Sequence, residues 1–354
     1  MSVNPDCDGE AKTVKPSRKK NPEQRKLNKK STVSQKQLDK QFNEHKKQIL
    51  ENLSQSACDL SPKGSVDRKC LDIMHTLNEN ENYVTTSSCS GRIALFHSIS
   101  EDTPCTSSDN GDDQSVASLK KMKRGAEKAM GWVYVKHGLL SPAELLAIVH
   151  TFCGAPLTEE EKKLDVEYSS RWETDDVPPS NTHVKTEDTL VYRKGFEGEV
   201  GGPLYDSLQS GASDFQLPTV GTVSLKMEPY VMHVECRTME NAKTILTAAV
   251  TDGGYRNSGV IPPGKKIMCG IRCTTGLGME VPLVLSGHNY VHGNRQYMWE
   301  LLHTANCKMF DNEKRTLKLQ NSLESRLKIR VILVYLKKKS ECILEQCIGL
   351  FIAV

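Results

Sequence analysis

The residues best suited to chemistry form a short polar run between two apolar segments. Residues 85–92 (TTSSCSGR) bring together five hydroxyls, one thiol, one glycine and one arginine. Hydroxyls and backbone N–H groups can donate together, Gly91 allows a ligand to approach the backbone, and Arg92 offers a planar fork for a carboxylate or phosphate. The run predicts a turn that holds a polar ligand, although a hairpin whose hydroxyls satisfy its own turn has the same composition.

Two later segments repeat this combination of arginine, hydroxyl and glycine. Residues 256–259 read RNSG, and Arg272 precedes residues 274–276, which read TTG. If strands bring the three segments to one edge of a sheet, they form a pocket for a carboxylate or phosphate ligand. If they do not, the arginines face solvent on unrelated loops.

The elements that must position these residues follow from hydrophobic periodicity and from helix start and stop signals. Alternation along residues 230–237 predicts a strand with Met232 and Val234 on its core face and His233 on a face that is open to a ligand. The pattern predicts helices at residues 38–53, 65–77, 141–152, 238–250 and 290–326, and further strands at 83–86, 93–96, 132–136 and 267–274.

This order of elements predicts an α+β fold with a mixed β-sheet, helices packed on it, and the three arginine turns converging on a cleft. We expect one domain at residues 34–326, with flexible loops at 98–125 and 154–218. Residues 1–33 are expected to be a disordered basic arm, and residues 327–354 a divergent tail that is a lineage-specific extension or a misjudged gene boundary. No strand is followed by G-x-G-x-x-G, so a standard Rossmann fold is not expected.

Charge distribution and cysteine content limit which partners and which cellular compartment are expected. The 47 Lys and Arg nearly balance the 44 Asp and Glu, but residues 12–47 are strongly basic, which indicates either a polyanion contact or a solvated tail. The 12 cysteines form no C-x-x-C pair, so we expect reduced thiols, a cytoplasmic protein and no metal site. No run reaches the roughly 18 apolar residues that span a bilayer, so no membrane contact is expected.

A series of motifs resembles one known family. In order, they are residues 63–67 (KGSVD), 85–92, 135–137 (VKH), 228–229 (EP), 233–237 (HVECR), 254–259 (GYRNSG), 281–283 (VPL) and Asn306. Over roughly residues 42–326 the chain is similar to the tRNA wybutosine-synthesising protein 3 family. The resemblance implies an S-adenosylmethionine-dependent methyltransferase that acts on the tricyclic guanosine beside the anticodon of phenylalanine tRNA. There it methylates N4 of the 7-aminocarboxypropyl-demethylwyosine intermediate.

The methyl donor and the modified base, the two substrates implied by the resemblance, each carry an amino-acid group. The arginine-hydroxyl-glycine turns are suited to binding the carboxylates of these groups. We expect the methyl donor to contact Ser88, Ser90, Gly91, Arg92, Arg256, Ser258 and Gly259. The tRNA substrate is expected to contact Lys63, Arg237, Arg272, Thr275 and Asn306. The candidates for accepting a proton or orienting the base are His137 and His233, with Glu228 and Asp67 behind them.

Each of these roles has an alternative. Either histidine could make a structural hydrogen bond at a strand end, and Glu228 could organise an arginine instead of acting as a base. The whole protein could be a non-catalytic adaptor that presents the tRNA anticodon loop to other wybutosine-pathway enzymes. A thiol-dependent hydrolase built on Cys89 is a third possibility.

Overall fold

The computed structural model describes residues 35–54, 66–100, 127–172, 199–211, 215–261, 266–273 and 275–352. The chain divides into two compact units, residues 1–45 and 46–354. Helix α2 (Gln35–Ser54) begins in the first unit and ends in the second. The predicted arm, the loop at residues 101–126 and Lys63 lie outside the described residues, and everything below concerns the second unit.

Two sheets form the framework of this unit. The four-stranded sheet has the order β1-β6-β8-β7, with bounds β1 Tyr83–Cys89, β6 Val231–Cys236, β7 Gly259–Val260 and β8 Ile267–Arg272. The six-stranded sheet has the order β10-β9-β5-β2-β3-β4, with bounds β2 Arg92–Ser100, β3 Glu127–Lys136, β4 Val200–Gly201, β5 Thr222–Glu228, β9 Met279–Leu285 and β10 His288–Asn289. Each strand pair within the described residues is antiparallel.

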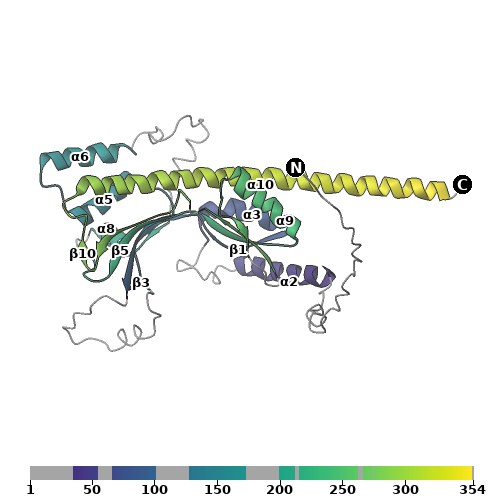
Figure 1. Ribbon diagram of the computed structural model, residues 1–354, viewed down its shortest axis with the longest axis horizontal. Coiled ribbons are helices and arrows are strands. Elements are labelled where there is room, and N and C mark those ends of the chain that lie inside the picture. The colour runs from purple at the N-terminus through teal and green to yellow at the C-terminus, as the bar shows by residue number, and fades with distance from the viewer. Residues whose placement is uncertain are drawn as a thin grey trace, which may run out of the picture. The chain divides into compact units, whose positions relative to one another are not determined.

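The helices of this unit pack on the two sheets or on one another. They are η2 Arg68–Cys70, α3 Leu71–Glu79, α5 Pro142–Cys153, α6 Glu159–Ser170, α8 Pro203–Ser210, α9 Met239–Leu246, the π-helical turn η4 Thr247–Asp252 and α10 Arg295–Ile352. Figure 1 shows α10 running alongside both sheets, with α5 near the six-stranded sheet and α3 and α9 near the four-stranded one. Helix α10 therefore ties the two halves of the unit together.

Local signals account for several of these elements. Ser141 caps α5 in a complete capping box with Glu144, and Thr238 caps α9 by accepting a hydrogen bond from the Asn241 N–H. In β6, Met232 and Val234 are fully buried, as the alternation predicts. The α+β class is confirmed by this combination of helices and antiparallel sheets.

Three expectations about the architecture are wrong in detail. One mixed sheet was expected, but there are two antiparallel sheets. The loop expected at residues 154–218 contains α6, β4 and α8, and its acidic residues at 159–161 form the first turn of α6. The closing helix does not end near residue 326, since α10 continues to Ile352.

Candidate functional site

The polar run at residues 85–92 crosses from one sheet to the other and is not a hairpin. Cys89 ends β1 in the four-stranded sheet, and Arg92 begins β2 in the six-stranded sheet. Gly91 adopts a φ of +96°, and a Cβ there would lie 2.8 Å from Nδ2 of Asn312 and 3.0 Å from the Glu228 carbonyl. Packing against protein atoms therefore explains this glycine, whereas the sequence suggested close approach of a ligand.

Asn312 of α10 fastens this crossing to a second one beside it. Its Nδ2 donates to the Ser90 carbonyl at 2.9 Å, and its Oδ1 accepts from the Tyr230 N–H at 2.7 Å, just where the chain passes from β5 to β6. The side chain is completely buried. A single asparagine thus holds two of the connections between the sheets, β1 to β2 and β5 to β6, which the sequence analysis missed. The one available signal was a polar residue on the buried face of α10.

A compact polar cluster lies against this crossing. Oδ2 of Asp67 accepts from the Ser90 N–H at 2.6 Å, while its Oδ1 lies 3.8 Å from Nε2 of His137. Cys89 joins them, and one ligand-type atom from each of Asp67, Cys89 and His137 lies within 4.8 Å of the others. The structure therefore brings together two of the predicted catalytic residues and the central cysteine.

The electrostatics of the cluster keep its thiol protonated. Burial, and then the charge of Asp67, raise the pKa of Cys89 to about 11. Ser90 is 5% exposed, and its Oγ has no hydrogen-bond partner within the described part of the chain. A buried hydroxyl without a partner is costly, so Ser90 is the residue of the cluster best suited to contact a polar ligand.

The side chain of Arg92 contacts two other residues of the protein. Its Nε donates to Oε2 of Glu228 at 2.5 Å, and its Cζ stands 4.2 Å from the centroid of the Trp132 ring. Arg92 and Glu228 are also direct partners in the β2–β5 register. Glu228 therefore organises an arginine, which is the alternative that the sequence offered for it.

The register of the four-stranded sheet aligns further candidates with Cys89. Cys89, Val231 and Arg272 form one row across β1, β6 and β8. Two residues along the strands, Ser87, His233 and Gly270 form a second row. Directly opposed residues share a face of the sheet, and two strand spacings separate Cys89 from Arg272 by about 10 Å.

His233 lies in the second of these rows. Its Nδ1 is 2.8 Å from Oγ of Ser87, and its ring lies against Gly270. The two predicted histidines therefore occupy different positions on the site, His137 beside Asp67 and His233 over the sheet.

The second and third arginine turns form one unit. The Arg272 N–H donates to Oγ of Ser258 at 3.1 Å, and Nε of Arg272 donates to the Asn257 carbonyl at 3.2 Å. Oγ1 of Thr275 donates to Oδ1 of Asn257 at 3.2 Å. The hydroxyls of these turns therefore stabilise the turns themselves, and Arg256 remains exposed beside Ser258 and Gly259.

Two predicted substrate contacts lie elsewhere. Arg237 follows the opposite end of β6, where it donates to the Glu81 carbonyl at 2.9 Å. Asn306 is fully buried, with both polar atoms of its side chain bonded at 2.8 Å to the backbone of Leu140. The structure does not bring either residue to the cluster. The length of β6 separates Arg237 from the cluster, and Asn306 is enclosed by the protein core.

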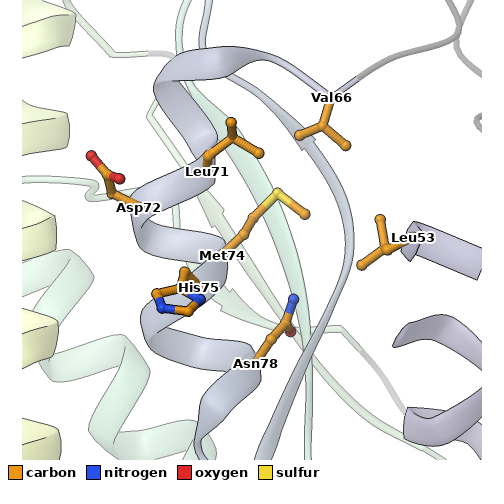
Figure 2. Close-up of a pocket in the computed structure, with 7 residues that line it drawn as sticks. All are labelled: Leu53, Val66, Leu71, Asp72, Met74, His75 and Asn78. Carbon is orange, nitrogen blue, oxygen red and sulfur yellow. The ribbon is translucent and has the colours of Figure 1, made fainter. Parts of the chain in front are cut away.

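Ser88 faces away from the cluster. Its Oγ donates to the sulfur of Met74 at 3.5 Å. Met74 also lines a pocket of about 440 Å³ beside α3, together with Leu53, Val66, Leu71, Asp72, His75 and Asn78. Figure 2 shows Leu71, Met74 and His75 along α3. None of the predicted site residues lines this pocket.

Two lysine ion pairs near the site were also missed. Lys69 pairs with Glu313 of α10, and Lys136 pairs with Glu144 of α5, both at 2.5 Å. Burial raises the pKa of Glu313 despite the opposing charge of Lys69, and burial lowers the pKa of Lys136. These pairs fix α10 and α5 around the cluster. Lys69 and Glu313 are 244 residues apart in sequence, too far for spacing to reveal their pairing.

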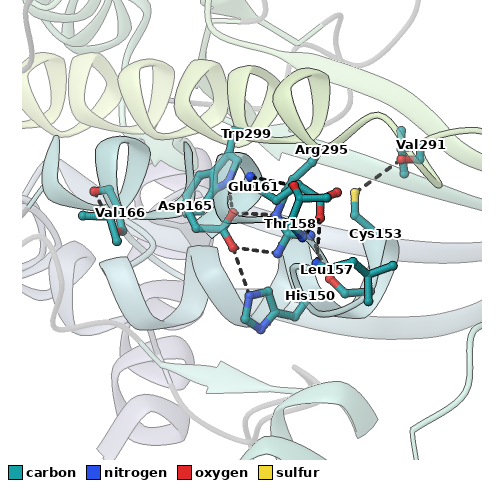
Figure 3. A network of polar contacts seen from close by, with 12 residues as sticks. His150, Cys153, Leu157, Thr158, Glu161, Asp165, Val166, Val291, Arg295 and Trp299 are labelled. Atoms are coloured by element: carbon teal, nitrogen blue, oxygen red, sulfur yellow. Dashed lines mark hydrogen bonds and ion pairs between the residues drawn. The ribbon is translucent and has the colours of Figure 1, made fainter. Parts of the chain in front are cut away.

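A separate polar network anchors α6 to α10. Arg295 donates to both carboxylate oxygens of Asp165 at 2.6 Å, and Trp299 and His150 also contact that carboxylate (Figure 3). Burial opposes the charge of Asp165, but these hydrogen bonds outweigh it and lower the pKa. The network explains why a strongly acidic segment forms an ordered helix.

Comparisons with known proteins identify the family of this chain. The profile of the family described as Methyltransferase TYW3 matches residues 44–325. The tRNA wybutosine-synthesizing protein 3 homolog of Xenopus laevis is 28% identical over 270 residues, covering 76% of this chain and 71% of that protein. The Bos taurus homolog is 30% identical over 274 residues, covering 77% and 70%.

Two more distant similarities extend the comparison. The Arabidopsis thaliana protein named tRNA wybutosine-synthesizing protein 2/3/4 is 26% identical over 277 residues, covering 78% of this chain and 20% of that protein. The solved structure of PH1069 from Pyrococcus horikoshii is 21% identical with a TM-score of 0.45, covering 82% of this chain and 96% of that chain.

The class of protein is therefore a tRNA-modifying methyltransferase built on two antiparallel sheets. Since the profile match spans most of the sequence, the chain belongs to the Methyltransferase TYW3 family of wybutosine synthesis. Within the described residues, no helix combines the length and apolar character needed to cross a membrane.

Proposed function

We propose that this protein transfers a methyl group from S-adenosylmethionine to N4 of the 7-aminocarboxypropyl-demethylwyosine intermediate beside the anticodon of phenylalanine tRNA. Family membership supports the reaction class. The observation that carries the proposal is the cluster of Asp67, Ser90 and His137 at the junction of the sheets, in line with Arg272 across β1, β6 and β8.

The residues at this junction fit a methyl donor with an amino-acid end. When bound, the donor supplies an electrophilic methyl group. Ser90 offers a buried hydroxyl that has no partner within the described residues, and the exposed arginines Arg256 and Arg272 offer positive charge for a carboxylate. Gly259 leaves open space where a side chain would otherwise stand. Of the predicted donor contacts, Ser90, Arg256 and Gly259 are thus the best supported.

The chain's own residues also supply a route for the proton. Methylation of a ring nitrogen requires a positioned acceptor for the proton that the nitrogen loses. The imidazole of His137 can take that proton, and the carboxylate of Asp67 beside it stabilises the resulting charge. His233, braced by Ser87, is suited to orienting the base on the sheet.

Neither alternative function gains support from the geometry. A thiol-dependent hydrolase needs a reactive thiolate, whereas burial raises the pKa of Cys89 to about 11. A tRNA-binding adaptor has no need of a buried cluster beside an unsatisfied hydroxyl. We expect the protein to act in the cytoplasm. The Arabidopsis thaliana relative is named tRNA wybutosine-synthesizing protein 2/3/4, and this chain covers only 20% of its length. This name and length support the proposal that the present protein associates with enzymes of neighbouring steps.

Titration calorimetry with S-adenosylmethionine tests the donor site. We expect Ser90→Ala to weaken donor binding by about fivefold, because one hydrogen bond is worth about 1 kcal/mol. Ser88→Ala is the matched control, since its hydroxyl contacts Met74 and its loss should leave donor affinity unchanged. Absence of donor binding by the wild-type protein, together with retained tRNA binding, would favour the adaptor.

A further inference from the structure

Three metal-ligand side chains from distant parts of the sequence meet where the two sheets join. Asp67 precedes η2, Cys89 ends β1, and His137 follows β3. A carboxylate oxygen, a sulfur and an imidazole nitrogen from these residues lie within 4.8 Å of one another. Oxygen, sulfur and nitrogen are the donor atoms that Zn²⁺ takes from proteins.

The spacing suits a cation after a small adjustment. Bonds of about 2.0–2.3 Å in a tetrahedral site place the ligand atoms about 3.3–3.8 Å apart. Nε2 of His137 and Oδ1 of Asp67 are already 3.8 Å apart. The widest separation in the cluster therefore needs to contract by about 1 Å, which side-chain rotation can provide.

Features around the cluster favour a bound ion. Oδ2 of Asp67 accepts the Ser90 N–H at 2.6 Å, which directs Oδ1 toward His137 as outer hydrogen bonds do for metal ligands. The side chains of His137 and Asp67 are 15% and 5% exposed. The neighbouring hydroxyl of Ser90 is buried without a partner among the described residues, so it can bind a water molecule on the ion.

We propose that Asp67, Cys89 and His137 form a three-residue site for Zn²⁺ or another thiophilic divalent cation, with the fourth position open to water. On binding, the thiol of Cys89 releases its proton to solvent and His137 binds as the neutral imidazole. The cation joins β1 of the four-stranded sheet to the end of β3 of the six-stranded sheet. Cysteine spacing did not reveal this site, because its ligands are one cysteine and two remote residues.

A consequence follows for catalysis, and this step rests on the proposed function. The cation binds the imidazole of His137, to which we assign the proton. Bound Zn²⁺ therefore inhibits methyl transfer in proportion to its occupancy, and a chelator restores the activity.

Metal binding is measured on the full chain without donor or tRNA, so its result is independent of the proposed reaction. We expect the chelator-treated protein to bind one Zn²⁺ per chain. Co²⁺ should give a thiolate-to-cobalt charge-transfer band in the near ultraviolet. Zn²⁺ at about 100 times its Kd should raise the Tm by about 5 °C.

Variants separate this site from other thiols. Cys89→Ser should abolish the cobalt band and lower Zn²⁺ affinity by at least about tenfold, and His137→Ala should do likewise. Cys153→Ser is the matched control, because Cys153 is also half-buried and its thiol contacts the Val291 carbonyl. The metal-free Tm of each variant verifies that it folds. Failure of the wild type to bind Zn²⁺, or unchanged affinity in folded Cys89→Ser, would overturn the proposal.

Discussion

Replacing Asn306 with alanine separates a structural role from the substrate-binding role that the sequence suggested. Oδ1 of Asn306 accepts from the Leu140 N–H, and its Nδ2 donates to the Leu140 carbonyl, both at 2.8 Å. Both residues are fully buried, so bulk water cannot replace the lost partners. Each stranded backbone group costs about 1–3 kcal/mol, and Asn306→Ala should therefore lower the free energy of unfolding by about 2–6 kcal/mol.

Urea unfolding and calorimetry measure this loss. For a domain of this size, it corresponds to a fall in Tm of about 4–12 °C. Thr304→Ala is the control in the same helix, because Thr304 is exposed and bonds the Glu300 carbonyl. Its effect should stay within about 0.5 kcal/mol. The structural role is refuted if Asn306→Ala leaves the urea midpoint unchanged while the KM for tRNA rises about tenfold.

Three further outcomes are expected from the geometry. Because burial raises the pKa of Cys89 to about 11, iodoacetamide at neutral pH should alkylate it about 300-fold more slowly than a free thiol, and rapid labelling in peptide mass spectra would contradict this. Hydrogen bonds from Arg295 and its neighbours outweigh burial and lower the pKa of Asp165, so its stabilisation is complete above its unfolded pKa of about 3.9 and is lost as the pH falls through the lower folded pKa. Acid unfolding curves should then fall less steeply for Asp165→Asn than for the wild type, and equal slopes would count against the network. Gly91→Ala should destabilise the fold by at least about 2 kcal/mol in urea, since the new Cβ would meet Asn312 at a positive φ; a neutral result would mean that the crossing is not tightly packed.

The sequence predicted correctly those elements that are stabilised by residues close together in the chain. The capping box at Ser141 and the alternation through Met232 and Val234 each lie within a few residues, and the structure confirms both. In contrast, α6 was missed because most of its surface is exposed and acidic. Its order depends on the bond between Asp165 and Arg295, which are 130 residues apart.

The candidate site was predictable only in part for the same reason. Residues 85–92 were recognised by composition, but a hairpin and a crossing between sheets have the same local sequence. Asn312, which is 222 residues from Ser90 in sequence, fixes the crossing. The chemistry of Arg92 depends likewise on a strand partner, Glu228, that periodicity does not identify.

The most direct test of the central claim is mass spectrometry of the anticodon nucleoside. Phenylalanine tRNA carrying the unmethylated tricyclic intermediate is incubated with S-adenosylmethionine and either the wild-type protein or Asp67→Asn. We predict that the wild type adds one methyl group at N4. Asp67→Asn should bind the tRNA equally well but turn over about 100-fold or more slowly, because the charge beside His137 is gone. An unmethylated nucleoside after incubation with the wild type, or full activity in Asp67→Asn, would contradict the assignment.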